Sequence, residues 1–551
     1  MKIQSRRNFL KTGALSAIAI AASGPLFKNL AKSPVIRKET DLLFRPFPHP
    51  WMPKMDFAYL TDVNEDPFKS SVQVTQDGIL VPRDVSNDRF SVNTRWFVEN
   101  FGFIMLAADN GGEFYSVNDI NKSLNLNYEF AKSRVIRNSN VRDKYEKSGT
   151  KFSAEIEHLT ELSRELLESA GKIQRDAERC ARISDKALEY ALWAGEKIEL
   201  ERAVSEIQRM NRKDPFHFGC ESRQMIWAKS EEFTKRFPEL FNFATVTHYV
   251  WDSWYELFEP TEGHYNWGVK DDIVDFLMKH NIEIEGRPLF WFHPTVTPDW
   301  LKLKNYDELK QYMEKHIYDL VTHYKDNVLS WEVFNEYHDW ANIFNHSKEQ
   351  TIELTRLAFD RTKEVNPKVT RILNNCCPWA EYAAMGRMAR MDATRPLRSP
   401  RKFIEDLTNE GVDFDVLGIQ IYFPRRDLSD IVRLIERLEK FNKPIYITEL
   451  GATSGYSIEH VLDGQTKISN DPYEWHRRWD EELQADWLEQ VYSIYYSRPL
   501  IKAVNWYDFT DFRPFIVNGG LAREDVSTKL SFNRLKELLS SWNRLPGEIR
   551  N

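Results

Sequence analysis

SWEVFNE (residues 330–336) and KPIYITEL (residues 443–450) are two β-prone apolar stretches, and each carries a glutamate at or next to its end. A carboxylate at the end of a buried strand is energetically costly unless it has a task. Glu336 and Glu449 could meet if the two stretches were neighbouring strands of one barrel. Two carboxyl groups flanking a sugar acetal are what hydrolysis of a glycosidic bond requires. The sequence therefore indicates an enzyme.

Around these stretches, strands and helices alternate from residue 215 to residue 545. Such alternation is typical of an α/β fold with parallel strands, and eight such units close into a (β/α)8 TIM barrel. In this fold the chemistry lies at the carboxyl ends of the strands, where Glu336 and Glu449 fall. We expect strands at residues 216–220, 244–249, 284–292, 329–334, 369–374, 416–421, 445–448 and 503–507.

The chain upstream of the barrel has a different character. Residues 40–117 are short β-prone runs broken by turn residues, which predicts a small β domain. Two interpretations of this domain are open. It could be a carbohydrate-binding module in which Trp96 and Phe101 are platforms for sugar rings, or a domain that only packs against its neighbours.

Residues 118–212 predict a helical, coiled-coil-like segment. Apolar residues recur at three- and four-residue steps with charges between them. This pattern is typical of a long amphipathic helix or a helical hairpin. Because Ala and Ser occupy many core positions, we favour a segment that folds back on the neighbouring domains. The alternative is an oligomerisation stalk.

The amino end and the composition narrow the class of protein. At 551 residues and 42% hydrophobic content, the chain is too long for one simple core. Residues 1–31 contain SRRNFLK (residues 5–11) and then a short, weakly apolar run, the pattern of a twin-arginine export signal. We therefore expect a periplasmic or secreted protein with no stable membrane insertion. The net charge of −8 argues against a nucleic acid partner, and no cysteine spacing indicates a metal site.

Several motifs resemble those of glycoside hydrolase family 10, the xylanase family. WEVFNE (residues 331–336) resembles the acid/base motif of that family, Trp-Asp-Val-Val-Asn-Glu, and ITEL (residues 447–450) resembles its nucleophile strand. GRPLFWFH (residues 286–293), GIQ (residues 418–420) and WYDFTD (residues 506–511) follow in the family's order. The resemblance covers residues 215 to 539, about 60% of the chain.

The resemblance implies roles for individual residues. Glu336 would be the general acid/base and Glu449 the nucleophile of a retaining double displacement. The substrate would be a β-linked polysaccharide or oligosaccharide, cleaved in the manner of an endo-1,4-β-xylanase, and no cofactor or metal would be needed. The candidate substrate-binding residues are Asn335, Trp251, Trp254, Arg287, His293, Gln420, Tyr422, Trp506 and Tyr507. His248 and His338 are further candidates for the same cleft.

The chain also departs from the family pattern. VWDSW (residues 250–254) stands where the family has Glu-Asn and Lys, so Trp251 and Trp254 could stack on a different sugar or pack in the wall. Arg287 and Tyr422 each replace a histidine, although a tyrosine hydroxyl can still donate to Glu449. These changes leave open a different β-glycan as the substrate, or a carbohydrate-binding pseudoenzyme.

Overall fold

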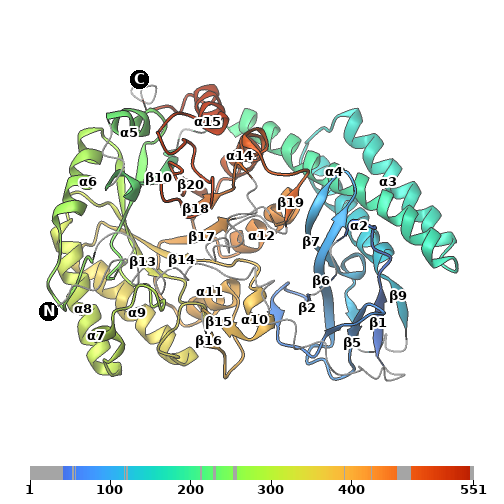
Figure 1. Cartoon of the computed structure of the whole chain (residues 1–551), viewed down its shortest axis with the longest axis horizontal. Coiled ribbons are helices and arrows are strands. Elements are labelled where there is room, and N and C mark those ends of the chain that lie inside the picture. Colours follow the sequence, from blue (N-terminus) through green and yellow to red (C-terminus); the bar gives the residue numbers. More distant parts are fainter. Residues whose placement is uncertain are drawn as a thin grey trace, which may run out of the picture.

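The computed structural model describes residues 41–546, with gaps at residues 53–54, 56, 117, 119–121, 211, 213, 227–230, 252–256, 390, 423–424 and 456–472. The expected export signal and Trp254 lie outside the described residues. The described chain forms a barrel, a β unit beside it, and a group of helices that lies against both (Figure 1).

Eight parallel strands close into a barrel, which confirms the predicted fold. The strands in order are β10 (His217–Glu221), β11 (Phe243–Thr247), β12 (Glu283–Arg287), β13 (Ser330–Asn335), β14 (Thr370–Asn375), β17 (Val416–Tyr422), β18 (Ile445–Gly451) and β20 (Ile501–Trp506). Several are buried along their whole length, because helices cover the outside and side chains fill the inside. The expected third strand is shorter than predicted and ends at Arg287.

Helices alternate with the barrel strands. Their boundaries follow from local signals: α8 begins at a capping box formed by Asn305 and Glu308, and α9 at one formed by Ser347 and Gln350. The helices are α5 (Glu231–Arg236), α6 (Gly268–Lys279), α7 (Asp299–Lys302), α8 (Tyr306–His323), α9 (Lys348–Val365), α10 (Glu381–Met385), α11 (Pro400–Asn409), α12 (Leu428–Glu439), α14 (Glu481–Tyr496) and α15 (Leu530–Ser541). Between α10 and α11 lies a small hairpin of β15 (Arg387–Met388) and β16 (Met391–Asp392).

The upstream β unit contains two sheets. The first has the order β4 (Gln73–Val74), β5 (Ile79–Val81), β1 (Leu42–Arg45) and β9 (Ser123–Asn125). The second has the order β19 (Glu474–Trp475), β7 (Gly102–Ala108), β6 (Arg89–Val98), β2 (Ala58–Thr61) and β3 (Pro67–Phe68), with β8 (Tyr115–Ser116) also paired to β6. Strand β19 comes from the barrel, after β18 (Figure 1).

Trp96 and Phe101 belong to the core of this β unit. They are 1% and 0% exposed, so neither ring can present a face to a sugar. Phe101 packs edge-on against Trp193 of the helical segment. The packing interpretation therefore holds for these two residues, and the proposal of sugar platforms was wrong.

The helical segment consists of three helices: α2 (Leu126–Lys147), α3 (Ala154–Lys172) and α4 (Ala177–Met210). The first break follows Gly149, whose φ of +93° ends the path of α2. Contacts such as Arg202 to Ser497, 2.9 Å from Nη2 to Oγ, tie α4 to the barrel, as expected of a segment that folds back. Oligomerisation through this segment stays a prediction. In the part of the chain that the structure describes, no helix is both long and apolar enough to cross a bilayer.

Candidate functional site

Glu336 follows β13 in a left-handed backbone conformation, with φ of +59°. Such a φ is uncommon for a residue with a side chain and is typical of functional positions. The carboxyl group is buried and accepts hydrogen bonds from Trp291 Nε1 at 2.8 Å and from Gln420 Nε2 at 3.0 Å. Burial, followed by the charge of Glu449, raises the pKa of Glu336 to about 8. A carboxylic acid in this environment keeps its proton near neutral pH.

Glu449 lies on β18, and donors from three other strands surround it. Arg287 Nη2 and Asn374 Nδ2 donate to Oε1, the latter at 3.4 Å, and the Tyr422 hydroxyl donates to Oε2. A guanidinium and a phenol are donors suited to a charged carboxylate. Glu336 and Glu449 therefore sit in different surroundings although they are the same residue type.

Three amide side chains, those of Gln420, Asn335 and Asn374, connect these carboxyl groups. Gln420 Nε2 donates both to Glu336 and to Asn335 Oδ1, the latter at 3.1 Å. Asn374 Nδ2 lies 3.2 Å from the same Asn335 oxygen and also reaches Glu449. Asn335 is 1% exposed, and its side-chain oxygen is fully used in this network. The arrangement fixes the two carboxyl groups relative to each other.

Arg287 is the centre of a buried group of acids. Its guanidinium contacts Glu449, lies 3.3 Å from Glu332 Oε2 and 3.8 Å from Glu221 Oε2, and faces the ring of Tyr507 at 5.7 Å. The side chain is 1% exposed, and its charge acts directly on these acids; that it also binds substrate stays a prediction. Burial raises the pKa of Glu332 well above its usual range.

Comparison with known proteins shows which family this chain belongs to. The sequence model of glycosyl hydrolase family 10 matches residues 210–518. The chain belongs to glycosyl hydrolase family 10. The resemblance seen in the motifs is thereby confirmed.

Characterised relatives of this family 10 chain are distant. It is 24% identical over 307 residues to endo-1,4-beta-xylanase B of Thermotoga neapolitana, across 54% of this chain and 78% of that protein. It is 24% identical over 282 residues to endo-1,4-beta-xylanase C of Paenibacillus barcinonensis, across 47% of this chain and only 24% of that protein. A solved structure, xylanase 10B from Thermotoga petrophila in complex with xylobiose, shares 22% identity with a TM-score of 0.44, covering 62% of this chain and 97% of that one.

The other predicted site residues of this family 10 chain differ in their positions relative to the two glutamates. Tyr507 lies beside Tyr422, and its hydroxyl accepts from Arg223 at 2.9 Å. His293 stacks on Trp291 with ring centroids 4.7 Å apart. Trp251 is half-buried. Trp506 is 0% exposed and donates from Nε1 to the Gly519 carbonyl at 2.9 Å, so the prediction that it binds substrate does not fit.

Both additional histidine candidates lie in the interior. His248 is 0% exposed and is enclosed by aromatic rings. His338 is also 0% exposed, and its Nδ1 lies 2.8 Å from the Tyr382 hydroxyl. Neither ring can reach a substrate from these positions. In the described ranges, no group of three or more His, Cys, Asp or Glu side chains could hold a metal ion.

Sequence reasoning missed three side chains of the site: Trp291, Asn374 and Glu332. Trp291 lies within the third-strand motif GRPLFWFH, and its position after a barrel strand could have indicated that it lies at the active-site end of the barrel. Asn374 ends the predicted fifth strand, where the same positional rule applies. Glu332 alternates with apolar residues inside the fourth strand, and only the barrel interior explains a buried acid there.

Proposed function

We propose that this chain is a retaining glycoside hydrolase that cleaves a β-linked glycan, with endo-1,4-β-xylanase-like activity. Glu336 is the general acid/base and Glu449 the nucleophile. The observation that carries the proposal is the contrast between the two carboxyl groups. One is buried with a pKa raised to about 8, and the other receives a guanidinium and a phenol as donors.

The first step follows from this contrast. The protonated carboxyl of Glu336 gives its proton to the glycosidic oxygen while a carboxylate oxygen of Glu449 attacks the anomeric carbon. The glycosidic bond breaks, the leaving sugar departs as an alcohol, and a glycosyl ester forms on Glu449. Glu336 is then ionised and remains hydrogen-bonded to Trp291 and Gln420.

The second step reverses the roles. Glu336 takes a proton from water, the oxygen of that water attacks the anomeric carbon, and the ester bond to Glu449 breaks. Loss of negative charge on Glu449 in the intermediate would leave Arg287 without one of its partners, but the Glu221 carboxyl lies 3.8 Å from the same guanidinium. Two inversions at one carbon give net retention of the β configuration.

The test separates the two roles. Glu449→Ala should abolish cleavage of an aryl β-xyloside, and added azide should restore formation of an α-glycosyl azide. Glu336→Ala should retain the first step only with a good leaving group, and azide should then yield the β-glycosyl azide. Proton NMR of the first-formed product of the unchanged protein should show the β anomer. Release of the α anomer would exclude the double displacement.

A different β-glycan is the second candidate substrate. It is favoured by Arg287 and Tyr422, which replace two histidines of the family pattern, and by Trp251 in place of the polar stretch. Comparing hydrolysis of aryl β-xyloside, aryl β-glucoside and a panel of polysaccharides decides between these substrates. Binding without turnover across the panel would instead identify a pseudoenzyme. Export by the twin-arginine route, to the periplasm or beyond, is part of the proposal and is tested by fractionating cells that express an Arg6→Lys, Arg7→Lys variant.

A further inference from the structure

The region before the barrel, here called the N-terminal extension, comprises β1 to β9 and α2 to α4 (residues 42–210). It lies against one side of the barrel (Figure 1). One group of its contacts with the barrel falls on a short segment, residues 425–428, which leads from β17 into the start of α12. Each of these four consecutive residues is bound by a different element of the extension.

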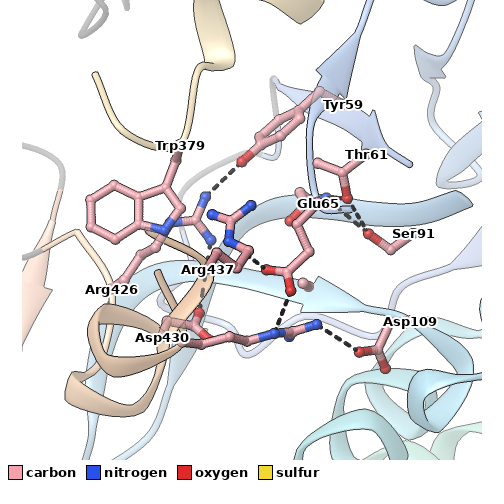
Figure 2. Close-up of a pocket in the computed structure, with 12 residues that line it drawn as sticks. Tyr59, Thr61, Glu65, Ser91, Asp109, Trp379, Arg426, Asp430 and Arg437 are labelled. Carbon is pink, nitrogen blue, oxygen red and sulfur yellow. Dashed lines mark hydrogen bonds and ion pairs between the residues drawn. The ribbon is translucent and has the colours of Figure 1, made fainter. Parts of the chain in front are cut away.

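The first two residues are held by strands. The amide nitrogen of Met105 on β7 donates to the Arg425 carbonyl at 2.9 Å. The guanidinium of Arg426 donates from Nη2 to the hydroxyl of Tyr59 on β2 at 2.6 Å, as Figure 2 shows, and it also lies over the ring of Trp379. Both Arg426 and Tyr59 are almost fully buried.

The next two residues are held by helices. Arg134 on α2 donates from both terminal nitrogens to the Asp427 carboxylate, at 2.9 and 2.6 Å, and the two side chains are 4% and 0% exposed. The amide nitrogen of Leu428 donates at 2.9 Å to Glu196 on α4. Asp427 also caps α12 by accepting from the amide nitrogens of Ser429 and Asp430. A bidentate ion pair of this kind fixes geometry strongly because it admits one orientation.

Glu196 extends this contact to a second loop of the barrel. Its carboxylate accepts from Trp475 Nε1 at 2.9 Å and lies 2.6 Å from His476 Nε2. Trp475 belongs to β19, the strand that the barrel inserts beside β7. One buried carboxylate therefore binds the loops that follow β17 and β18 together.

Residues 425–428 are close in the chain to the catalytic site. Tyr422, the last residue of β17, precedes Arg425 by three positions and donates its hydroxyl proton to Glu449. We propose that the N-terminal extension, through its hydrogen bonds and ion pair with residues 425–428, positions the Tyr422 hydroxyl against the nucleophile. The extension then completes the active site and is not an independent binding module. This inference rests on the proposed function.

The decisive variant is the double substitution Arg134→Met with Asp427→Asn. Asparagine still caps α12, and removal of both charges avoids leaving one of them buried alone. The matched control is Arg142→Met on the same helix, because among the described residues the ion pairs of Arg142 are with Glu146 and Glu157 of the helical segment. A milder second variant, Tyr59→Phe, removes the acceptor of the Arg426 bond and serves if the double variant does not fold.

We expect the double variant to lower kcat/KM for an aryl β-xyloside about tenfold to a hundredfold, because a small misplacement of a reacting group is enough for such a loss. The loss should fall on kcat and leave KM nearly unchanged, because the Tyr422 hydroxyl contacts the carboxyl group that reacts. Tyr59→Phe should lower kcat less, and the control should leave both constants unchanged.

Tyr422→Phe provides the specific readout. In that background the double variant should lower kcat no further, because the donor it displaces is already gone. An undiminished loss of kcat would overturn the proposal, as would an unchanged kcat in a folded double variant or in Tyr59→Phe. General destabilisation would lower the unfolding temperature without lowering the kcat of the folded protein, and that result also counts against it.

Hydrogen exchange tests the contacts between the N-terminal extension and residues 425–428 separately from catalysis. Peptides that cover β17 and the start of α12 should exchange faster in the double variant than in the Arg142→Met control, while peptides of β13 should not change. If the unchanged protein hydrolyses no β-glycan, the proposed function fails. The exchange measurement still tests whether the extension holds residues 425–428 in place. Equal exchange in variant and control would refute it.

Discussion

Replacing Glu336 by glutamine should stabilise the protein at neutral pH while it strongly lowers activity. Burial raises the pKa of this carboxyl from its ordinary 4.5 to about 8. In the unfolded chain the group ionises at its ordinary value, so between these two pH values the unfolded state has lost a proton that the folded state retains. The free energy of unfolding then falls by about 1.4 kcal/mol per pH unit and levels off above the folded pKa.

Glutamine cannot ionise, so the free energy of unfolding of the variant does not fall with pH on account of this residue. At pH 7 the difference amounts to about 3 kcal/mol in favour of Glu336→Gln, and near the ordinary pKa it vanishes. Both carboxyl oxygens accept hydrogen bonds, from Trp291 and Gln420, whereas an amide can accept on only one atom. That mismatch lowers the stability of the variant by about 1 kcal/mol at every pH and leaves the slope unchanged.

The assay is urea unfolding followed by tryptophan fluorescence, with both proteins measured at several pH values between about 5 and 8 at fixed ionic strength. The slope of the difference against pH is the readout, because other titrating groups are common to both proteins. A difference that stays flat with pH would refute the claim that Glu336 is a buried, protonated acid. Hydrolysis of a substrate with a poor leaving group, measured in parallel, should fall about a hundredfold to ten-thousandfold.

Three further outcomes are expected. Trp291→Phe removes a donor that favours ionised Glu336, so the alkaline limb of kcat/KM should move to higher pH; movement to lower pH would contradict this. Arg287→Met leaves Glu449 without its buried partner and should destabilise the protein by about 3–5 kcal/mol in chemical denaturation, with a loss of activity. Glu285→Met removes a buried acid whose pKa is raised to about 8, so the unfolding temperature should rise at pH 7 but not near pH 5; equal shifts at both would refute it.

The sequence carried enough information to predict the barrel. Its strands are buried on both faces and therefore read as apolar runs, and polar residues at their carboxyl ends mark one edge of the sheet. Glu336 and Glu449 stood out because they follow such runs. The position of Tyr422 beside Glu449 could also be foreseen, since it ends the neighbouring strand.

Tertiary features of the site could not be read in this way. Arg287 was expected to face a substrate, but its burial depends on which acids share the barrel interior, and those come from β10, β12, β13 and β18. Trp506 follows the same positional rule as Tyr507, yet successive residues of a strand point to opposite sides, and Trp506 points outward into the helix layer. The two-residue strand β19 is too short to leave a periodic pattern.

The pairing of β19 with β7 has a consequence for biosynthesis. Gly102 and Phe103 leave the ribosome long before Trp475 and Glu474, their partners in the sheet. During translation one edge of the second sheet therefore has open backbone donors and acceptors, a ready template for association with other nascent chains. This edge of β7 can be completed only after the carboxyl-terminal half has been synthesised, so the two halves of the chain are joined late in folding.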